Sequence, residues 1–184
     1  MPRSIFRRSQ AASAFAGLTA LLVLAGCAND EPARLVCPSA TIPEESAQLV
    51  AFQGGGRDLT DVRYDLQVTD VALTCALERD DNERTLETEL GVRFTAEKGP
   101  ANREGVAAGR YYVAVIGPDG DVLSRRSFDV EIALPGNQTR VATTQYLSPT
   151  IPLAQGAATD AYTIYVGLVL SPEQLRFNRA NLGQ

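Results

Sequence analysis

The chemistry open to this chain is limited first by the absence of histidine from all 184 residues. Histidine is the commonest general base and metal ligand, and it belongs to most serine and cysteine catalytic triads. The sequence also lacks a Gly-x-Ser-x-Gly elbow, and no phosphate-binding lysine follows Gly54-Gly55-Gly56. We therefore expect no enzyme activity of these classes, no metal and no cofactor, and we interpret the glycine run as a turn.

Carboxylates are numerous, but they form no recognisable motif. Asp80-Asp81-Asn82-Glu83 has the charge of a calcium site without the spacing or the glycine of an EF-hand loop. Asp119 and Asp121 flank Gly120 in a second acidic turn. We interpret both segments as solvated turns. A glycosidase would need two acids that face one cleft, and the sequence alone identifies no such pair.

Tyrosines are the most suggestive binding residues. Five of the six lie in the C-terminal half, namely Tyr111, Tyr112, Tyr146, Tyr162 and Tyr165. On an exposed sheet face these rings can bind a partner protein or a glycan. The alternative is that the rings fill the core and leave their hydroxyl groups at its rim, and the sequence leaves both interpretations open.

The N-terminus has the layout of an export signal. Arg3, Arg7 and Arg8 precede an apolar stretch that runs from about Ala11 to Ala25. A basic start, a short apolar middle and small residues at the end are typical of a secretory signal peptide. The fully apolar part is far shorter than the ~20 residues that a membrane-spanning helix needs.

The end of this segment, Leu24-Ala25-Gly26-Cys27, resembles the lipobox of bacterial lipoproteins. The resemblance implies that the signal peptide, residues 1–26, is removed and that Cys27 is acylated. Each buried CH₂ contributes about 0.8 kcal/mol, so several acyl chains would hold the protein on a membrane almost permanently. Ala28 follows the cysteine, and in that family the absence of Asp at this position favours the outer membrane, facing the periplasm. The alternative is an ordinary signal followed by a buried cysteine.

Cys37 and Cys75 remain once Cys27 is acylated. In an oxidising compartment an even number of cysteines indicates a disulfide, and closing this separation of 38 residues stabilises the fold by roughly 4 kcal/mol. Two independent buried thiols are the alternative. A metal site is not expected from two cysteines in a chain without histidine.

The net charge argues against nucleic-acid partners. The full chain carries a net charge of −5, and removal of residues 1–26 takes away three arginines and no acid. The remaining chain is therefore more acidic and repels nucleic acid and anionic lipid head groups.

The pattern of the remaining chain predicts an all-β fold. We expect a tether over residues 27–46 and a single domain over 47–184, because sustained period-2 alternation begins near residue 47. The alternation changes parity at Thr69-Asp70, which predicts a β-bulge. Residues 111–134 predict a hairpin, and Ser171-Pro172-Glu173-Gln174 predicts the start of a short helix that ends near Arg179.

About seven short strands with intervening turns favour an antiparallel β-sandwich, immunoglobulin- or fibronectin-like at the level of the pattern. Segments 97–110 and 148–160 are predicted loops. The chain has no tryptophan, so it lacks the tryptophan core of true immunoglobulin domains.

These observations favour a lipid-anchored periplasmic domain that acts as an accessory or binding subunit of a cell-envelope assembly, without catalysis. Membrane lipid, through acylated Cys27, and an envelope protein complex are the expected partners. The alternatives are a carboxylate-dependent glycan hydrolase and a structural envelope lipoprotein with no specific ligand.

Overall fold

The computed structural model describes residues 35–80 and 83–181. The predicted signal peptide, Cys27 and the first part of the predicted tether lie outside these residues. The described chain is mostly strand, in two sheets, and it ends in one short helix, which confirms the predicted all-β sandwich with a C-terminal helix. In the described residues the strands number nine rather than about seven.

The elements follow one another along the chain in a simple order. They are β1 (Ser39–Thr41), η1 (Glu44–Ser46), β2 (Gln48–Phe52), η2 (Leu59–Asp61), β3 (Val62–Asp80), β4 (Glu83–Lys98), β5 (Val106–Ile116), β6 (Val122–Ala133), β7 (Arg140–Leu147), β8 (Thr150–Pro152), η3 (Thr159–Ala161), β9 (Thr163–Leu168) and α1 (Pro172–Asn181).

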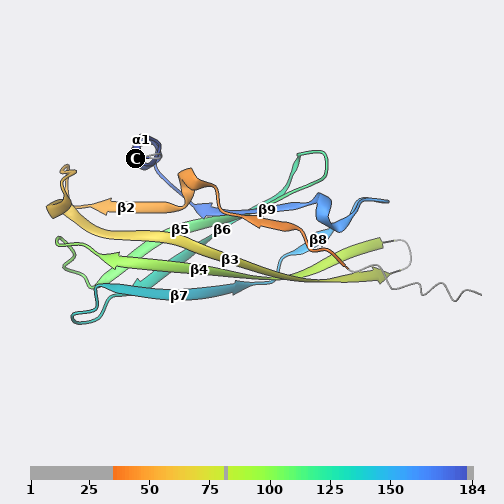
Figure 1. Ribbon diagram of the computed structural model, residues 1–184, viewed down its shortest axis with the longest axis horizontal. Helices are drawn as coiled ribbons and strands as arrows, with labels where there is room; N and C mark the ends of the chain where they lie inside the picture. The colour runs from red at the N-terminus through yellow and green to blue at the C-terminus, as the bar shows by residue number, and fades with distance from the viewer. Residues whose placement is uncertain (1–34, 81–82, 182–184) are drawn as a thin grey trace, which may run out of the picture. The chain divides into compact units, whose positions relative to one another are not determined.

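The strands form two layers. One sheet has the order β1-β9-β5-β6, and the other has the order β2-β3-β4-β7, with β8 also paired to β4 (Figure 1). All pairings are antiparallel except that of β1 with β9, which is parallel. β5 and β9 thus each lie between two other strands of the first sheet. This agrees with the apolar residues on both of their faces.

The two long strands β3 and β4 lie side by side in the middle of the second sheet. Their register shifts between Val68 and Asp70, where the sequence changes parity, so the predicted bulge is confirmed. Before the bulge, Tyr64, Leu66 and Val68 face the core and are buried. Because the bulge inserts one extra residue, the side chain of Val71 also faces the core. The side chains two, four and six positions later face the same way.

The core lies between the two sheets and is built from side chains of both. Leu66, Leu90 and Phe94 of one sheet and Tyr111 and Ile164 of the other are almost completely buried. The rings of Phe94 and Tyr111 meet edge to face, with centroids 4.8 Å apart. Such pairs contribute ≈ 0.5–1.5 kcal/mol beyond their buried area.

Cys37 and Cys75 form the predicted disulfide, with their Cα atoms 5.8 Å apart. Cys75 lies on β3 in the second sheet, whereas Cys37 directly precedes β1 in the first. The bond therefore joins the segment that enters the first sheet to the second sheet, and it holds the start of the folded chain in place.

Three segments differ from the sequence prediction. The predicted tether contains β1 and η1, so residues from Ser39 onward belong to the folded body. The predicted loop 97–110 already contains the start of β5, and the predicted loop 148–160 contains β8. β1 and β8 have three residues each. They are too short to show a period, and pairing with a longer neighbour forms them.

The C-terminal helix begins as predicted. The Ser171 hydroxyl accepts the backbone N–H of Gln174 at 3.2 Å, and the Gln174 side chain accepts the backbone N–H of Ser171 at 2.8 Å. This reciprocal capping box satisfies two of the free N–H groups at the helix start. Among the described residues, no helix is both long enough and apolar enough to cross a membrane.

Candidate functional site

A hollow with two carboxyl groups in its lining lies between the outer face of the second sheet and helix α1. We call it the helix cleft. Its main part has a volume of about 500 Å³, and a smaller part of about 220 Å³ adjoins it. The two parts share Val50, Phe52, Arg57 and Phe177 among their lining residues.

Strand register places the floor of the helix cleft. Asp65 on β3 lies opposite Val50 on β2 and opposite Glu97 on β4. Its neighbours Tyr64 and Leu66 face the core, so the alternation of a strand turns Asp65 to the outer face. Two carboxylates from neighbouring strands therefore line one hollow.

Asp65 is the least satisfied polar group in this hollow. The side-chain amides of Gln48 and Gln67 donate hydrogen bonds to its Oδ2 at 2.6 Å and 3.1 Å. Its Oδ1 is buried, and no described residue gives it a hydrogen bond. Burial raises the pKa of Asp65 and the negative charge of Glu97 adds to the rise, whereas the two amides act in the opposite direction.

Glu97 has a different environment from Asp65. Its carboxylate forms an ion pair with Arg140 of β7 at 3.2 Å, and both side chains are largely exposed. The helix cleft thus holds the buried carboxyl group of Asp65 beside the carboxylate of Glu97, which is paired with Arg140.

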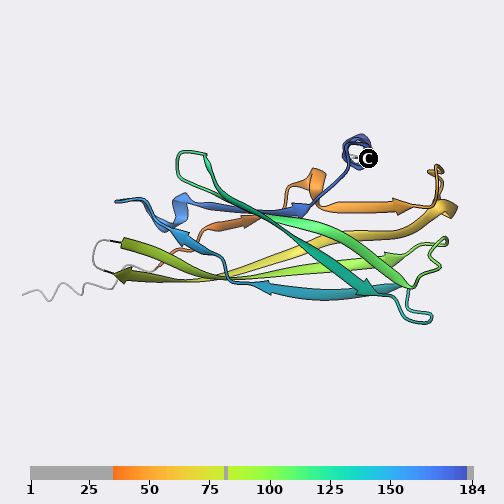
Figure 2. The ribbon, with the colours of Figure 1, turned by 180° about the vertical axis from the view of Figure 1, so that it is seen from behind.

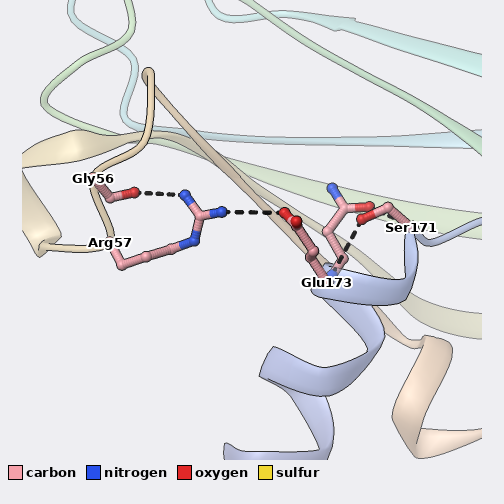
Figure 3. A network of polar contacts seen from close by, with 5 residues as sticks. Gly56, Arg57, Ser171 and Glu173 are labelled. Atoms are coloured by element: carbon pink, nitrogen blue, oxygen red, sulfur yellow. Dashed lines mark hydrogen bonds and ion pairs between the residues drawn. The ribbon is translucent and has the colours of Figure 1, made fainter.

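The opposite wall of the helix cleft is aromatic and cationic. The rings of Phe52 and Phe177 meet edge to face at 5.6 Å. The Arg57 guanidinium lies 5.0 Å from the centre of the Phe52 ring and forms an exposed ion pair with Glu173 at 3.4 Å. Figure 3 shows Arg57 between the carbonyl oxygen of Gly56 and the carboxylate of Glu173, so this side chain connects the β2–β3 loop to α1.

One buried amide holds α1 beside β2. The Asn178 side chain donates hydrogen bonds to the backbone carbonyls of Glu45 at 2.9 Å and Gln48 at 2.7 Å. Arg179 adds an ion pair to the Glu45 carboxylate at 2.9 Å, and its hydrogen bond lowers the pKa of Glu45. Asn178 and Phe177 thus both hold α1 against the segment from η1 to β2.

The cleft combines groups that suit a polar organic ligand. A protonated Asp65 can donate a hydrogen bond, Glu97 can accept one, and Phe52 and Phe177 offer apolar surface. Within residues 35–80 and 83–181, no group of three or more histidine, cysteine, aspartate or glutamate side chains is placed to hold a metal ion.

Two of the five candidate tyrosines are core residues. Tyr111 and Tyr162 are almost fully buried. The Tyr111 hydroxyl donates to the Gln145 side chain at 2.7 Å, and burial raises the pKa of Tyr111 to about 12. The Tyr162 hydroxyl accepts the backbone N–H of Ala154 at 2.7 Å. For these two the interpretation as a binding surface is wrong, because their rings fill the core.

The other three tyrosines lie on different outer faces. Tyr146 is 69% exposed on β7, whereas Tyr165 (36% exposed) and Tyr112 lie on neighbouring strands of the first sheet. Arg125 covers the Tyr112 ring at 4.2 Å. The predicted surface of five tyrosines therefore does not form, and at most Tyr112 and Tyr165 share a face.

The acidic turns have no special arrangement in the described residues. Asp80 and Glu83 are exposed at the ends of β3 and β4, and residues 81 and 82 lie outside the description. Asp119 and Asp121 are exposed in the β5–β6 turn. Sequence reasoning named these acids and missed Asp65 and Glu97, because only the register of β3 and β4 brings that pair together.

Comparisons of the chain with protein-family models, with curated proteins and with solved structures gave no match.

Proposed function

We propose that this protein is a lipid-anchored periplasmic domain that serves as a non-catalytic accessory or binding subunit of a cell-envelope assembly, with its anchor in the outer membrane. The lipid on Cys27 supplies the location, the sandwich supplies a rigid body, and the helix cleft supplies the recognition surface.

The disulfide between Cys37 and Cys75 carries this proposal. Such bonds form and persist in oxidising compartments and are rare in the cytosol. This supports export, which the basic and apolar start of the chain also indicates.

The position of the disulfide also limits where a partner can be. Cys37 follows Cys27 by ten residues, and an extended chain of that length reaches at most about 35 Å. A domain held by lipid at Cys27 would thus stay close to the membrane surface. We therefore propose a partner that is itself part of the membrane or lies next to it.

The helix cleft supports a binding role over a purely structural one. A buried carboxyl oxygen without a partner costs free energy, about 1–3 kcal/mol for a neutral group. Such groups are rare in native structures, and a functional role is one of the reasons for which they occur. Asp65 lines a hollow with aromatic walls, and this combination of a carboxyl group and rings supports recognition of a polar ligand.

Site-specific crosslinking in cells tests this proposal. A photoreactive amino acid replaces Leu59, which lines the cleft and is 85% exposed, and in a control protein it replaces Tyr146, which is exposed elsewhere. We expect one membrane-associated protein to be captured from position 59 and not from position 146. Equal capture from both positions, or none from position 59, contradicts the proposal.

A second candidate function, a carboxylate-dependent glycan hydrolase, draws on one specific observation. Asp65 and Glu97 lie opposite each other in one hollow, and Asp65 resists ionisation, as a general acid must. Incubation of the purified protein with cell-wall glycan tests it. Release of sugars by the native protein but not by the Asp65→Asn variant would favour the hydrolase, and our proposal predicts no release from either.

A further inference from the structure

Strand β6 leaves a long edge of the first sheet without a partner strand. It runs from Val122 to Ala133, and among the described strands it pairs only with β5. Figure 2 shows β6 passing from the β5–β6 turn down to the level of β7. The residues from Val122 to Ser127 are all exposed, so this half of the edge is accessible.

The backbone of this half has hydrogen-bonding groups on its free side. The Asp129 carbonyl accepts a hydrogen bond at 3.3 Å from Gln145 of the other sheet, so Asp129 turns its backbone groups away from β5. Residues two and four positions earlier share this orientation, because the orientation alternates along a strand. In the described part of the chain, nothing bonds to the outward backbone groups of Ser127 and Arg125.

An apolar hollow lies beneath the same edge. It has a volume of about 350 Å³ and lies between β5–β6 and the β7–β8 segment; its apolar lining is Val113, Val115, Phe128, Leu147 and Pro149. Farther along β6 the inward side chains Val130 and Ile132 close the core. Beside the hollow the inward positions are Ser124 and Arg126, which leave it open.

Arg126 supplies an unpaired positive charge at this hollow. Its guanidinium group makes no hydrogen bond or ion pair with any other described residue. Arg125, next to it, faces the other side and covers the Tyr112 ring. A cation without a partner on an acidic chain favours an anionic group in the ligand.

The same charges disfavour a second copy of this chain as the occupant. Antiparallel pairing of two β6 edges about their exposed halves would bring Arg125 and Arg126 of both copies together. Like charges directly opposite each other destabilise strand pairs, and inward-pointing charges are a known defence of edge strands against self-association.

We propose that the edge of β6 from Val122 to Phe128 binds an extended, acidic peptide segment of a partner protein as an added strand. The peptide backbone pairs with Arg125 and Ser127, alternate apolar side chains enter the hollow, and one carboxylate contacts Arg126. This mode of recognition joins backbone affinity to side-chain specificity. It uses a surface separate from the helix cleft and does not depend on it.

Peptide binding to the full-length protein in lipid nanodiscs tests the proposal. The probe is a labelled nonapeptide with glutamate at its central position, valine at the other odd positions and threonine at the even positions. A second peptide has lysine at the centre. We expect the glutamate peptide to bind at least about tenfold more tightly, since a hydrogen bond to a charged group contributes ≈ 1.5–3 kcal/mol.

Three variants separate the elements of this proposal. Ser127→Pro removes an outward N–H, which an edge strand tolerates, and it should weaken binding roughly tenfold or more, because a hydrogen bond and close approach are both lost. Ser127→Ala should bind normally. Arg126→Glu should reverse the preference and favour the lysine peptide. Hydrogen exchange should slow at residues 123–128 when the glutamate peptide binds.

The proposal is overturned if neither peptide binds below about 1 mM, a weak affinity by any measure. Equal binding of the two peptides, or unchanged binding by Ser127→Pro, would also contradict it. A single-chain amphiphile, dodecanoate, serves as the competing ligand class. If dodecanoate binds the hollow and slows no exchange on β6, while the peptides fail, the edge is not a strand-binding site.

Discussion

Removal of the disulfide gives the most quantitative prediction of this account. The perturbation is the double substitution Cys37→Ser and Cys75→Ser, which keeps two small polar side chains in place of the half-cystines. The bond closes a loop with a sequence separation of 38 residues. In the chain-entropy model, opening such a loop lowers the free energy of unfolding by about 4 kcal/mol at 25 °C.

The expected change is large enough for an unambiguous melting experiment. In a domain of this size each kcal/mol shifts the melting temperature by roughly 2–4 °C, so the double variant should melt about 8–16 °C lower. Circular dichroism during heating and during urea titration measures both the melting temperature and the free energy of unfolding. Reduction of the native disulfide should give the same result as the double substitution.

Two results would refute this reasoning. A loss of less than about 1 kcal/mol would mean that the bond does not restrict the unfolded chain as the model requires. A normal melting temperature after reduction, together with a low one in the double variant, would point to packing of the substituted side chains instead. Cys27→Ser alone serves as the control, and its unfolding should be unchanged.

Three further substitutions test the sites described above. Asp65→Asn should make the protein at least as stable at neutral pH. Burial raises the pKa of Asp65 in the folded state above its ordinary value of 3.8, so the folded state holds a proton that the unfolded chain releases, and the free energy of unfolding falls as pH rises above that value. Melting curves between pH 4 and 7 should therefore show a smaller decline for the variant, and an unchanged decline would contradict the assignment. Asn178→Ala removes two hydrogen bonds to backbone carbonyls and should cost about 1–3 kcal/mol. Hydrogen exchange should speed up in α1 and not in β4, and uniform acceleration would argue against a local role. Gly109→Ala places a Cβ atom 2.7 Å from a Leu66 methyl group and should cost about 1–3 kcal/mol by overpacking; a urea titration that finds no loss would show that Leu66 moves freely.

Local signals in the sequence predicted several elements correctly. The parity change at Thr69-Asp70 predicted the bulge in β3 because every inward side chain changes face after a slip of one residue. The Ser171–Gln174 capping box predicted the start of α1 because both partners lie within one turn. In each case the residues that decide the structure are neighbours along the chain.

Long-range features could not be predicted in the same way. β1 forms because Ser39–Thr41 pairs with β9, more than a hundred residues later in the chain, and three residues show no period of their own. In the sequence, Asp65 is an ordinary polar residue of a predicted strand, and Glu97 begins a predicted loop. Only the register of β3 with β4 makes them neighbours.

The tyrosines illustrate the limit for single residues. Tyr111 and Tyr112 are adjacent in sequence, yet one is in the core and the other lies under Arg125 on an outer face. Because side chains alternate along a strand, the two rings must lie on opposite faces of the sheet. When the residues on both faces are apolar, the sequence does not indicate which face is buried. The second sheet decides it, because its Phe94 packs against the Tyr111 face of β5.

Mass spectrometry of the native N-terminus shows whether the chain is anchored by lipid. We expect a membrane-bound chain that begins at Cys27 and carries diacylglycerol on its thiol, with residues 1–26 absent. An intact precursor with an unmodified thiol at Cys27, recovered from the cytosol, would contradict both the lipid anchor and the envelope location.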